Sequence, residues 1–130
     1  MLAAGGTGGH LFPAFALAEE LRRRGFEIDL ITDMRGDKYG ENFPAHATHQ
    51  LPSATFKSSS PIAILKTIYT LFRGFIASLK LIRKSRPAAL IGFGGYPSFM
   101  PLLAARLCRV PTAIHEQNAV LGRANRILAS

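Results

Sequence analysis

The apolar positions of this chain follow two periods that alternate along the sequence. Short apolar or alternating runs predict strands at residues 1–4, 26–32, 47–51, 88–93 and 110–115. Longer segments with helical spacing predict helices at residues 12–24, 62–82, 98–109 and 121–130. Because strands that alternate with helices form β-α-β units, we predict an α/β fold built on a parallel sheet. No stop signal follows the last helical segment, so we expect the polypeptide to continue beyond Ser130.

A glycine-rich segment joins the first predicted strand to the first helix, and it reads Gly5-Gly6-Thr7-Gly8-Gly9-His10. Glycine lets a ligand approach the backbone closely, and a helix N-terminus presents unpaired N–H groups, so the segment predicts an anion site. A dinucleotide fingerprint needs a third glycine where this chain has Leu11. A Walker A loop needs a lysine and a hydroxyl residue after Gly9, and neither is there. The alternative is a glycine-rich turn that binds no ligand.

Two further segments of this kind follow predicted strands. Gly92-Phe93-Gly94-Gly95-Tyr96-Pro97 comes at the end of the strand at 88–93, and His115-Glu116-Gln117-Asn118 follows the strand at 110–115. In an open parallel sheet the ligand crevice lies at the carboxyl ends of the strands. We therefore expect all three segments to line one crevice.

Composition indicates one globular domain, and charge adds information about its partners. With 130 residues, 48% of them hydrophobic and 18% charged, the chain is too apolar to be disordered. The formal net charge is +8, and no acidic residue lies between Glu41 and Glu116. The basic residues in that interval are Lys57, Lys66, Arg73, Lys80, Arg83, Lys84, Arg86, Arg106 and Arg109. They predict a surface for anions such as acidic lipids, a phosphorylated substrate or nucleic acid, although the aromatic residues lack the interleaving that a nucleic-acid stacking platform requires.

The remaining reactive side chains indicate neither a metal site nor a disulfide. Cys108 lies in an apolar helical pattern and predicts a buried structural thiol in a reducing cytoplasm. The N-terminus lacks the pattern of a signal peptide. His46 and His49 have no cysteine or carboxylate partner that the sequence reveals, so we expect surface histidines, no metal and no other cofactor.

The helix predicted at residues 62–82 is long enough to span a bilayer, but Lys66, Arg73 and Lys80 disfavour spanning. The residues expected to face the sheet are Ile68, Leu71, Phe72, Phe75, Leu79 and Ile82. Further apolar surface is left by Ile62, Ile64, Leu65, Tyr69 and Ile76. Two interpretations stay open: a helix that lies on an anionic membrane surface, and a core helix whose outer face a partner covers.

Together, Gly5-Gly6-Thr7-Gly8-Gly9-His10, Gly94-Gly95-Tyr96 and His115-Glu116-Gln117-Asn118 resemble, in order and spacing, the amino-terminal half of the MurG family. These bacterial enzymes are UDP-N-acetylglucosamine:undecaprenyl-diphospho-muramoyl-pentapeptide N-acetylglucosaminyltransferases. The resemblance covers essentially the whole chain. It implies a Rossmann-like parallel sheet with helices on both faces, one half of a GT-B glycosyltransferase. Residues 1–130 would form the amino-terminal domain on the acceptor and membrane side, and the carboxyl-terminal donor-binding domain would lie outside this chain.

The resemblance also implies which residues bind substrate. They are Thr7, Gly8, Gly9, Gly94, Gly95, Tyr96 and Asn118. The first loop would contact the acceptor diphosphate or the donor across the cleft. The second loop would lie on the acceptor side, with the hydroxyl and ring of Tyr96 against the muramyl sugar. Asn118 would contribute to the donor sugar-nucleotide site.

The implied reaction is an inverting transfer of N-acetylglucosamine to the C4 hydroxyl of the lipid-linked muramoyl-pentapeptide, which converts lipid I to lipid II in peptidoglycan synthesis. The transfer needs a base near that hydroxyl, for which we expect His10, with Glu116 as the alternative. This chain alone is expected to be inactive because one wall of the donor pocket is missing.

The implied partners are UDP-N-acetylglucosamine, undecaprenyl-diphospho-muramoyl-pentapeptide and an anionic membrane, the last through the region from Ile62 to Arg86. We expect no nucleic-acid partner, and a peripheral location at the cytoplasmic face of the bacterial inner membrane. Two other classes remain. One is a nicotinamide-dependent oxidoreductase, against which Leu11 counts, and the other is a non-enzymatic module that binds anions or a membrane surface.

Overall fold

The computed structural model describes residues 1–5, 8–33, 42–56 and 60–129. Their strands form one sheet in the order β3-β2-β1-β4-β5, and every neighbouring pair is parallel. The strands are β1 (Leu2–Ala3), β2 (Asp29–Thr32), β3 (Ala47–Gln50), β4 (Leu90–Gly92) and β5 (Thr112–Ile114). This is the strand order of the Rossmann fold, so the predicted parallel α/β sheet is confirmed.

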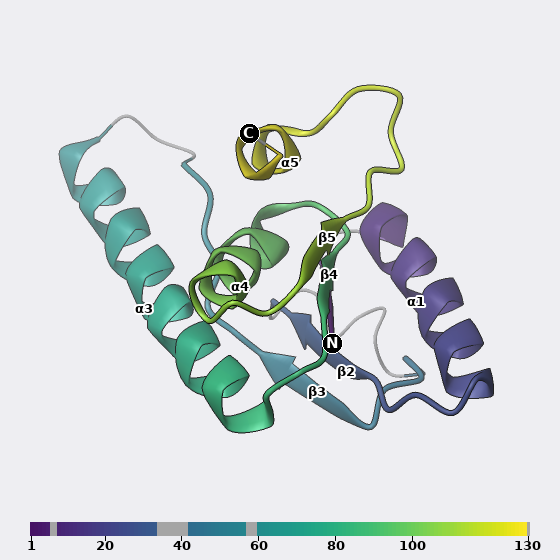
Figure 1. Ribbon diagram of the computed structural model, residues 1–130. Coiled ribbons are helices and arrows are strands. Elements are labelled where there is room, and N and C mark those ends of the chain that lie inside the picture. The colour runs from purple at the N-terminus through teal and green to yellow at the C-terminus, as the bar shows by residue number, and fades with distance from the viewer. Residues whose placement is uncertain (6–7, 34–41, 57–59, 130) are drawn as a thin grey trace.

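The helices cover both faces of the sheet, as expected (Figure 1). They are α1 (Gly8–Arg23), α3 (Pro61–Ser85), α4 (Tyr96–Leu107) and α5 (Arg123–Leu128). Helix α1 lies on one face, and α3 and α4 lie on the other (Figure 1). The N-terminus of α1 lies near the carboxyl ends of β4 and β5, on the side where α5 is also found (Figure 1). The predicted glycine-rich and polar segments therefore start at one edge of the sheet.

Alternation along the central strands divides the core into two layers. Leu2 and Leu30 belong to the cluster beneath α1, whereas the next residue of each strand, Ala3 and Ile31, belongs to the cluster beneath α3 and α4. Successive strand side chains point to opposite faces, which explains the division. Leu11 of α1 is only 2% exposed and packs in the first cluster. The position where a dinucleotide fingerprint has its third glycine is thus a buried core position here.

Helix α1 starts earlier than predicted. It begins at Gly8 rather than Phe12, so Gly8, Gly9 and His10 lie in its first turn and not in a loop. Its end agrees with the sequence, because Gly25 has φ +86° and the Phe26 N–H donates to the Leu21 carbonyl at 3.0 Å. Glycine has low helix propensity, so the pattern gave no reason to extend the helix through two of them.

Helix α3 faces the domain with only part of the stripe that the sequence predicted: Ile82 is buried, and Phe75 and Leu79 pack against the core. Gly74, Ser78 and Ile82 are its buried residues, whereas Ile68 and Phe72 are 51% and 61% exposed, so their predicted core positions were wrong. A Cβ at Gly74 would lie 2.2 Å from the Pro52 carbonyl oxygen. This close approach adds small residues to the inner face of α3, a feature that an apolar stripe cannot reveal.

Candidate functional site

The three predicted segments meet at one pocket of about 230 Å³ at the carboxyl edge of the sheet. Its lining residues are His10 from α1, Gly94, Gly95 and Tyr96 before and at the start of α4, Glu116 and Asn118 after β5, and the turn and helix from Gly122 to Asn125. Gly8 and Gly9 lie in the same helical turn as His10 but do not line the pocket. Thr7 lies outside the described residues.

Gly94 and Gly95 bring the second loop against the ring of His10. Both have a positive φ, +87° and +74°, which favours glycine. A Cβ at Gly94 would lie 3.4 Å from two ring atoms of His10, and one at Gly95 would lie 3.4 Å from a third. Backbone conformation therefore favours glycine at both positions, and at Gly94 a Cβ would also lie 3.2 Å from Asn125 Nδ2.

The start of α4 gives this pocket a second helix N-terminus. Tyr96 is the first residue of the helix and its side chain is 39% exposed. The Ser98 hydroxyl donates to the Gly95 carbonyl at 2.9 Å and so closes the turn before the helix. The N-termini of α1 and α4 both open near the pocket, and helix N-termini attract anions.

Glu116 holds the segment after β5 in place. Its Oε1 accepts from the backbone N–H and the side-chain amide of Asn118, at 3.1 and 2.7 Å. Its Oε2 accepts from the Gly122 N–H at 2.8 Å and from Asn125 Nδ2 at 3.0 Å. These hydrogen bonds, that of the Gly122 backbone above all, lower the pKa of Glu116 to about 2. The carboxylate is charged and fully occupied, which makes it a poor proton acceptor.

Asn125 is a site residue that sequence reasoning missed. It is 1% exposed in α5, and its Nδ2 donates both to Glu116 Oε2 and, at 3.3 Å, to the His115 carbonyl. It also lies beneath the second loop, since a Cβ at Gly94 would come 3.2 Å from Nδ2. No sequence signal separates this asparagine from a surface residue of the same short helix.

Gln117 is the second missed residue, because the polar run drew attention to its neighbours. Its side-chain amide contacts His10 Nδ1, which joins the segment after β5 to the first turn of α1. Its Oε1 is buried and has no hydrogen-bond partner in the described part of the chain. The position of Gln117 in the polar run at a strand end was the only available signal.

His115, unlike Glu116 and Asn118, contacts the neighbouring strand and not the pocket. Its backbone N–H donates to the Gly92 carbonyl at 2.8 Å, and its ring packs on Phe93 with the centroids 5.2 Å apart. It does not line the pocket. The residue therefore serves the sheet edge rather than the site.

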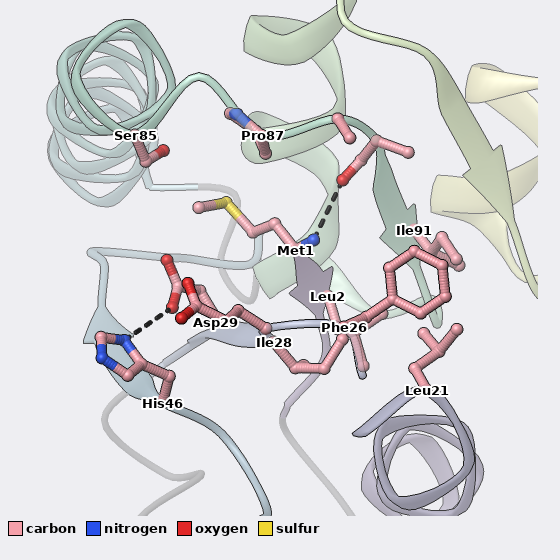
Figure 2. A pocket seen from close by; sticks show the side chains of 13 residues that line it. Met1, Leu2, Leu21, Phe26, Ile28, Asp29, His46, Ser85, Pro87 and Ile91 are labelled. Atoms are coloured by element: carbon pink, nitrogen blue, oxygen red, sulfur yellow. Dashed lines mark hydrogen bonds and ion pairs between the residues drawn. The ribbon is translucent and has the colours of Figure 1, made fainter. Parts of the chain in front are cut away.

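A larger cavity, of about 510 Å³, lies at the opposite edge of the sheet, near the amino ends of the strands (Figure 2). Met1, Leu2, Phe26 and Ile28 give it a largely apolar wall, and none of the predicted site residues lines it. Its polar corner is Asp29, whose carboxylate lies 3.8 Å from His46 Nδ1 (Figure 2).

The environment of the two histidines differs from the sequence-based expectation. His49 Nε2 lies 3.6 Å from the same Asp29 carboxylate, and its side chain is only 29% exposed. A carboxylate partner thus exists for both His46 and His49, which sequence distance had hidden because β2 and β3 are paired in space. The described residues contain no group of three or more His, Cys, Asp or Glu side chains that could hold a metal.

Known proteins resemble this chain closely. A protein of Allorhizobium ampelinum is 60% identical over 129 residues, which are 99% of this chain and 35% of that protein. A protein of Rhizobium leguminosarum bv. trifolii is 53% identical over 130 residues, which are 100% of this chain and 35% of that protein. Both are named UDP-N-acetylglucosamine--N-acetylmuramyl-(pentapeptide) pyrophosphoryl-undecaprenol N-acetylglucosamine transferase. The chain thus spans about a third of the length of these relatives.

Solved structures share the fold. The crystal structure of Acinetobacter baumannii MurG matches with a TM-score of 0.81 and 27% identity, over 99% of this chain and 38% of that one. The calicheamicin glycosyltransferase CalG4 matches with a TM-score of 0.60 and 19% identity, over 94% of this chain and 33% of that one. At this identity the match supports a shared fold and no more. The Rossmann-like sheet is that of the amino-terminal domain of GT-B glycosyltransferases, as predicted.

The glycosyltransferase family 28 N-terminal domain matches residues 1–130. The chain therefore belongs to glycosyltransferase family 28, whose N-terminal domain it matches over residues 1–130.

Proposed function

We propose that this chain is the acceptor-side half of an enzyme that transfers N-acetylglucosamine from UDP-N-acetylglucosamine to a lipid-linked muramoyl-pentapeptide, with inversion. The observation that carries the proposal is the meeting of the three segments at one pocket on the carboxyl edge of the sheet. The names of the relatives that are 60% and 53% identical support the choice of substrates. A carboxyl-terminal domain would complete the donor site, so this chain alone would not catalyse the transfer.

The acceptor diphosphate fits the electrostatics of the site. Backbone N–H groups at the start of α1 and of α4 can hold phosphate oxygens, and both helix N-termini lie at the pocket edge. We assign Thr7, Gly8 and Gly9 to this contact. Tyr96, which is 39% exposed, is assigned to the muramyl sugar. Asn118 is exposed beside the pocket, and we assign it to the donor.

His10 is our choice for the base that accepts the proton of the attacking hydroxyl. It lines the pocket, and its Nε2 has no hydrogen bond to any described residue. Glu116 is less suitable because its oxygens are occupied and its pKa is about 2. We assign Glu116 to holding the segment that carries Gln117 and Asn118.

The test is a transfer assay with a full-length protein that contains this chain, labelled UDP-N-acetylglucosamine and the lipid-linked acceptor. Replacing His10 by Ala should lower kcat by roughly 10²- to 10⁴-fold, the usual contribution of a general base. His46→Ala is the matched control, since that histidine is 72% exposed at the opposite edge of the sheet. Near wild-type turnover of His10→Ala would remove the base assignment, and no transfer by the unmodified protein would remove the proposed reaction.

A second part of the proposal concerns the apolar face of α3. By length and composition α3 could cross a membrane, and only 11% of its most apolar 18-residue window is buried. The large apolar residues of this face are 51–69% exposed: Ile62, Leu65, Ile68, Tyr69 and Phe72. Lys66 lies among them, and the Arg73 guanidinium lies 5.9 Å from the Tyr69 ring centroid. Because Gly74, Ser78 and Ile82 pack on the domain, we propose that α3 lies on an anionic membrane surface rather than spanning it.

Sedimentation with vesicles tests the apolar face of α3. The chain should bind anionic vesicles, bind neutral ones less, and lose affinity as salt rises. Phe72→Ser should weaken binding, whereas Phe26→Ser should not, since Phe26 is 59% exposed, about as much as Phe72, but lies across the sheet. Equal loss in both variants, or no binding at all, would contradict a membrane role for α3.

A further inference from the structure

We propose that Gln117 is a positioning residue that accepts a hydrogen bond from His10 Nδ1–H and thereby leaves Nε2 unprotonated toward the pocket. The inference rests on the proposed function, because a histidine can act as the base at Nε2 only in that tautomer. It adds to that function a residue whose side chain acts through His10 and not on substrate.

The contact between the two side chains links separate parts of the fold. Gln117 follows β5 and His10 lies in the first turn of α1, 107 positions earlier, yet the Gln117 amide reaches His10 Nδ1. On another side the imidazole lies against the loop at Gly94 and Gly95, where a Cβ at either glycine would lie 3.4 Å from a ring atom. Of the two ring nitrogens, Nδ1 is therefore the one that the protein holds, and Nε2 is the one available to a ligand.

The two orientations of the Gln117 amide have opposite consequences for the chemistry. If the NH₂ group faces His10, Nδ1 must accept, and the neutral ring then carries its proton on Nε2. If the amide oxygen faces His10, Nδ1 carries the proton and Nε2 keeps a free lone pair. Only the second orientation lets the ring remove a proton from an acceptor hydroxyl.

Hydrogen bonding elsewhere does not tie Gln117 to the first orientation. With the NH₂ group toward His10, Oε1 is buried and has no partner among the described residues. The amide nitrogen and oxygen have nearly the same shape, so a half-turn of the amide leaves the packing unchanged. That turn gives Oε1 a donor, namely His10 Nδ1–H. The amide oxygen is then satisfied, the NH₂ group takes the place that Oε1 held, and the ring is held in the form that a base needs.

An amide suits this position better than a carboxylate would. Both groups can accept from Nδ1–H, but a negative charge beside the ring would also favour the imidazolium, which cannot accept a further proton. A neutral acceptor fixes the tautomer without favouring the charged form. The nearby Glu116 carboxylate is instead turned to Asn118, Gly122 and Asn125.

The direct test is ¹⁵N NMR of a full-length protein with labelled histidine, without substrate, with the His10 signals assigned by difference from His10→Ala. Above the pH at which the imidazole loses its charge, the unmodified protein should show the proton on Nδ1. Gln117→Glu should keep it there, and Gln117→Leu should lose the preference. A proton on Nε2 in the unmodified protein would overturn the proposal, as would a Gln117→Leu spectrum identical to the unmodified one.

Kinetics give a second readout that a purely structural role would not reproduce. Gln117→Leu should lower kcat by roughly 10- to 100-fold, the usual effect of removing a group that orients a functional histidine, with little change in KM. Gln117→Glu should keep most of the activity, with the acidic limb of its pH profile moved to higher pH. Gln50→Leu, on β3 at the far edge of the sheet, is the matched control. Equal losses of activity in Gln117→Leu and Gln117→Glu would contradict a positioning role.

The two failures can be told apart. If His10→Ala remained active, the base assignment would fall, while the NMR result would still decide whether Gln117 sets the tautomer. If the NMR spectrum showed Nε2–H but His10→Ala were inactive, the inference about Gln117 would fall and the base assignment would have to rest on another arrangement.

Discussion

Gly94 decides how closely the second loop approaches His10 and Asn125. Its φ of +87° is shared by Gly25, whose φ is +86°, but the surroundings differ. A Cβ at Gly25 would meet nothing within 4 Å, whereas one at Gly94 would meet the His10 ring and the Asn125 amide. The two glycines thus separate the effect of backbone conformation from the effect of the site.

We predict that Gly25→Ala and Gly94→Ala both destabilise the fold by about 1–2 kcal/mol, the usual cost of the left-handed conformation for alanine. Only Gly94→Ala should also lower transferase activity in the full-length protein, by roughly tenfold or more, because its Cβ would crowd the Asn125 amide that hydrogen-bonds Glu116. Denaturant unfolding and a transfer assay measure the two effects. Equal activity of the two variants would show that the close packing at Gly94 does not contribute to transferase activity.

Glu116 gives a prediction that depends on pH. Its pKa in the folded chain is about 2, below the ordinary value of 4.5. A lowered pKa means that the charged form stabilises the fold, so this contribution is complete above about pH 4.5 and is lost as the pH falls through about 2. The unfolding midpoint of the unmodified chain should therefore exceed that of Glu116→Gln at pH 6, and the gap should shrink between pH 4.5 and 2. A gap that did not vary over this range would contradict the hydrogen-bonding role of the carboxylate.

At the scale of elements, the sequence pattern predicted the strands and helices. It was wrong about where β2 begins and about some of the residues through which α3 contacts the domain. Strand β2 begins at Asp29 and not at Phe26, because Phe26 is an exposed residue after the end of α1. The inner face of α3 was assigned only in part: Phe75, Leu79 and Ile82 pack on the core as predicted, but the close approach at Gly74 and the buried Ser78 were missed. Burial of a small residue against a backbone carbonyl leaves no periodic signal, so pattern alone could not find it.

Gly74→Ala tests this contact. Alanine is about 1 kcal/mol better than glycine inside a helix, so propensity alone predicts stabilisation. The Cβ would lie 2.2 Å from the Pro52 carbonyl oxygen, and overpacking of this kind typically costs about 1–3 kcal/mol. We expect a net loss of stability in denaturant unfolding. A more stable variant would mean that α3 does not approach Pro52 as closely as described.

At the scale of the whole molecule, the parallel sheet explains why the sequence predicted the position of the site but not all of its residues. Strand ends of a parallel sheet share one edge, which was enough to bring together the segments at His10, Gly94 and Glu116. Gln117 and Asn125 act through side-chain contacts with residues distant in sequence, His10 in one case and Gly94 in the other. Such contacts depend on how α1 and α5 sit on the sheet, which no local pattern records.

The most direct test of the account is a chimera in which this chain replaces the matching residues of the Allorhizobium ampelinum relative, so that a related protein supplies the remainder. We predict transfer of N-acetylglucosamine to the lipid-linked acceptor within about tenfold of the parent, because the identity of 60% covers nearly the whole exchanged domain. We also predict that His10→Ala lowers this transfer by roughly 10²- to 10⁴-fold. A folded chimera that binds UDP-N-acetylglucosamine but transfers nothing, or one whose transfer is indifferent to His10, would contradict the assignment of this pocket as the acceptor half of the active site.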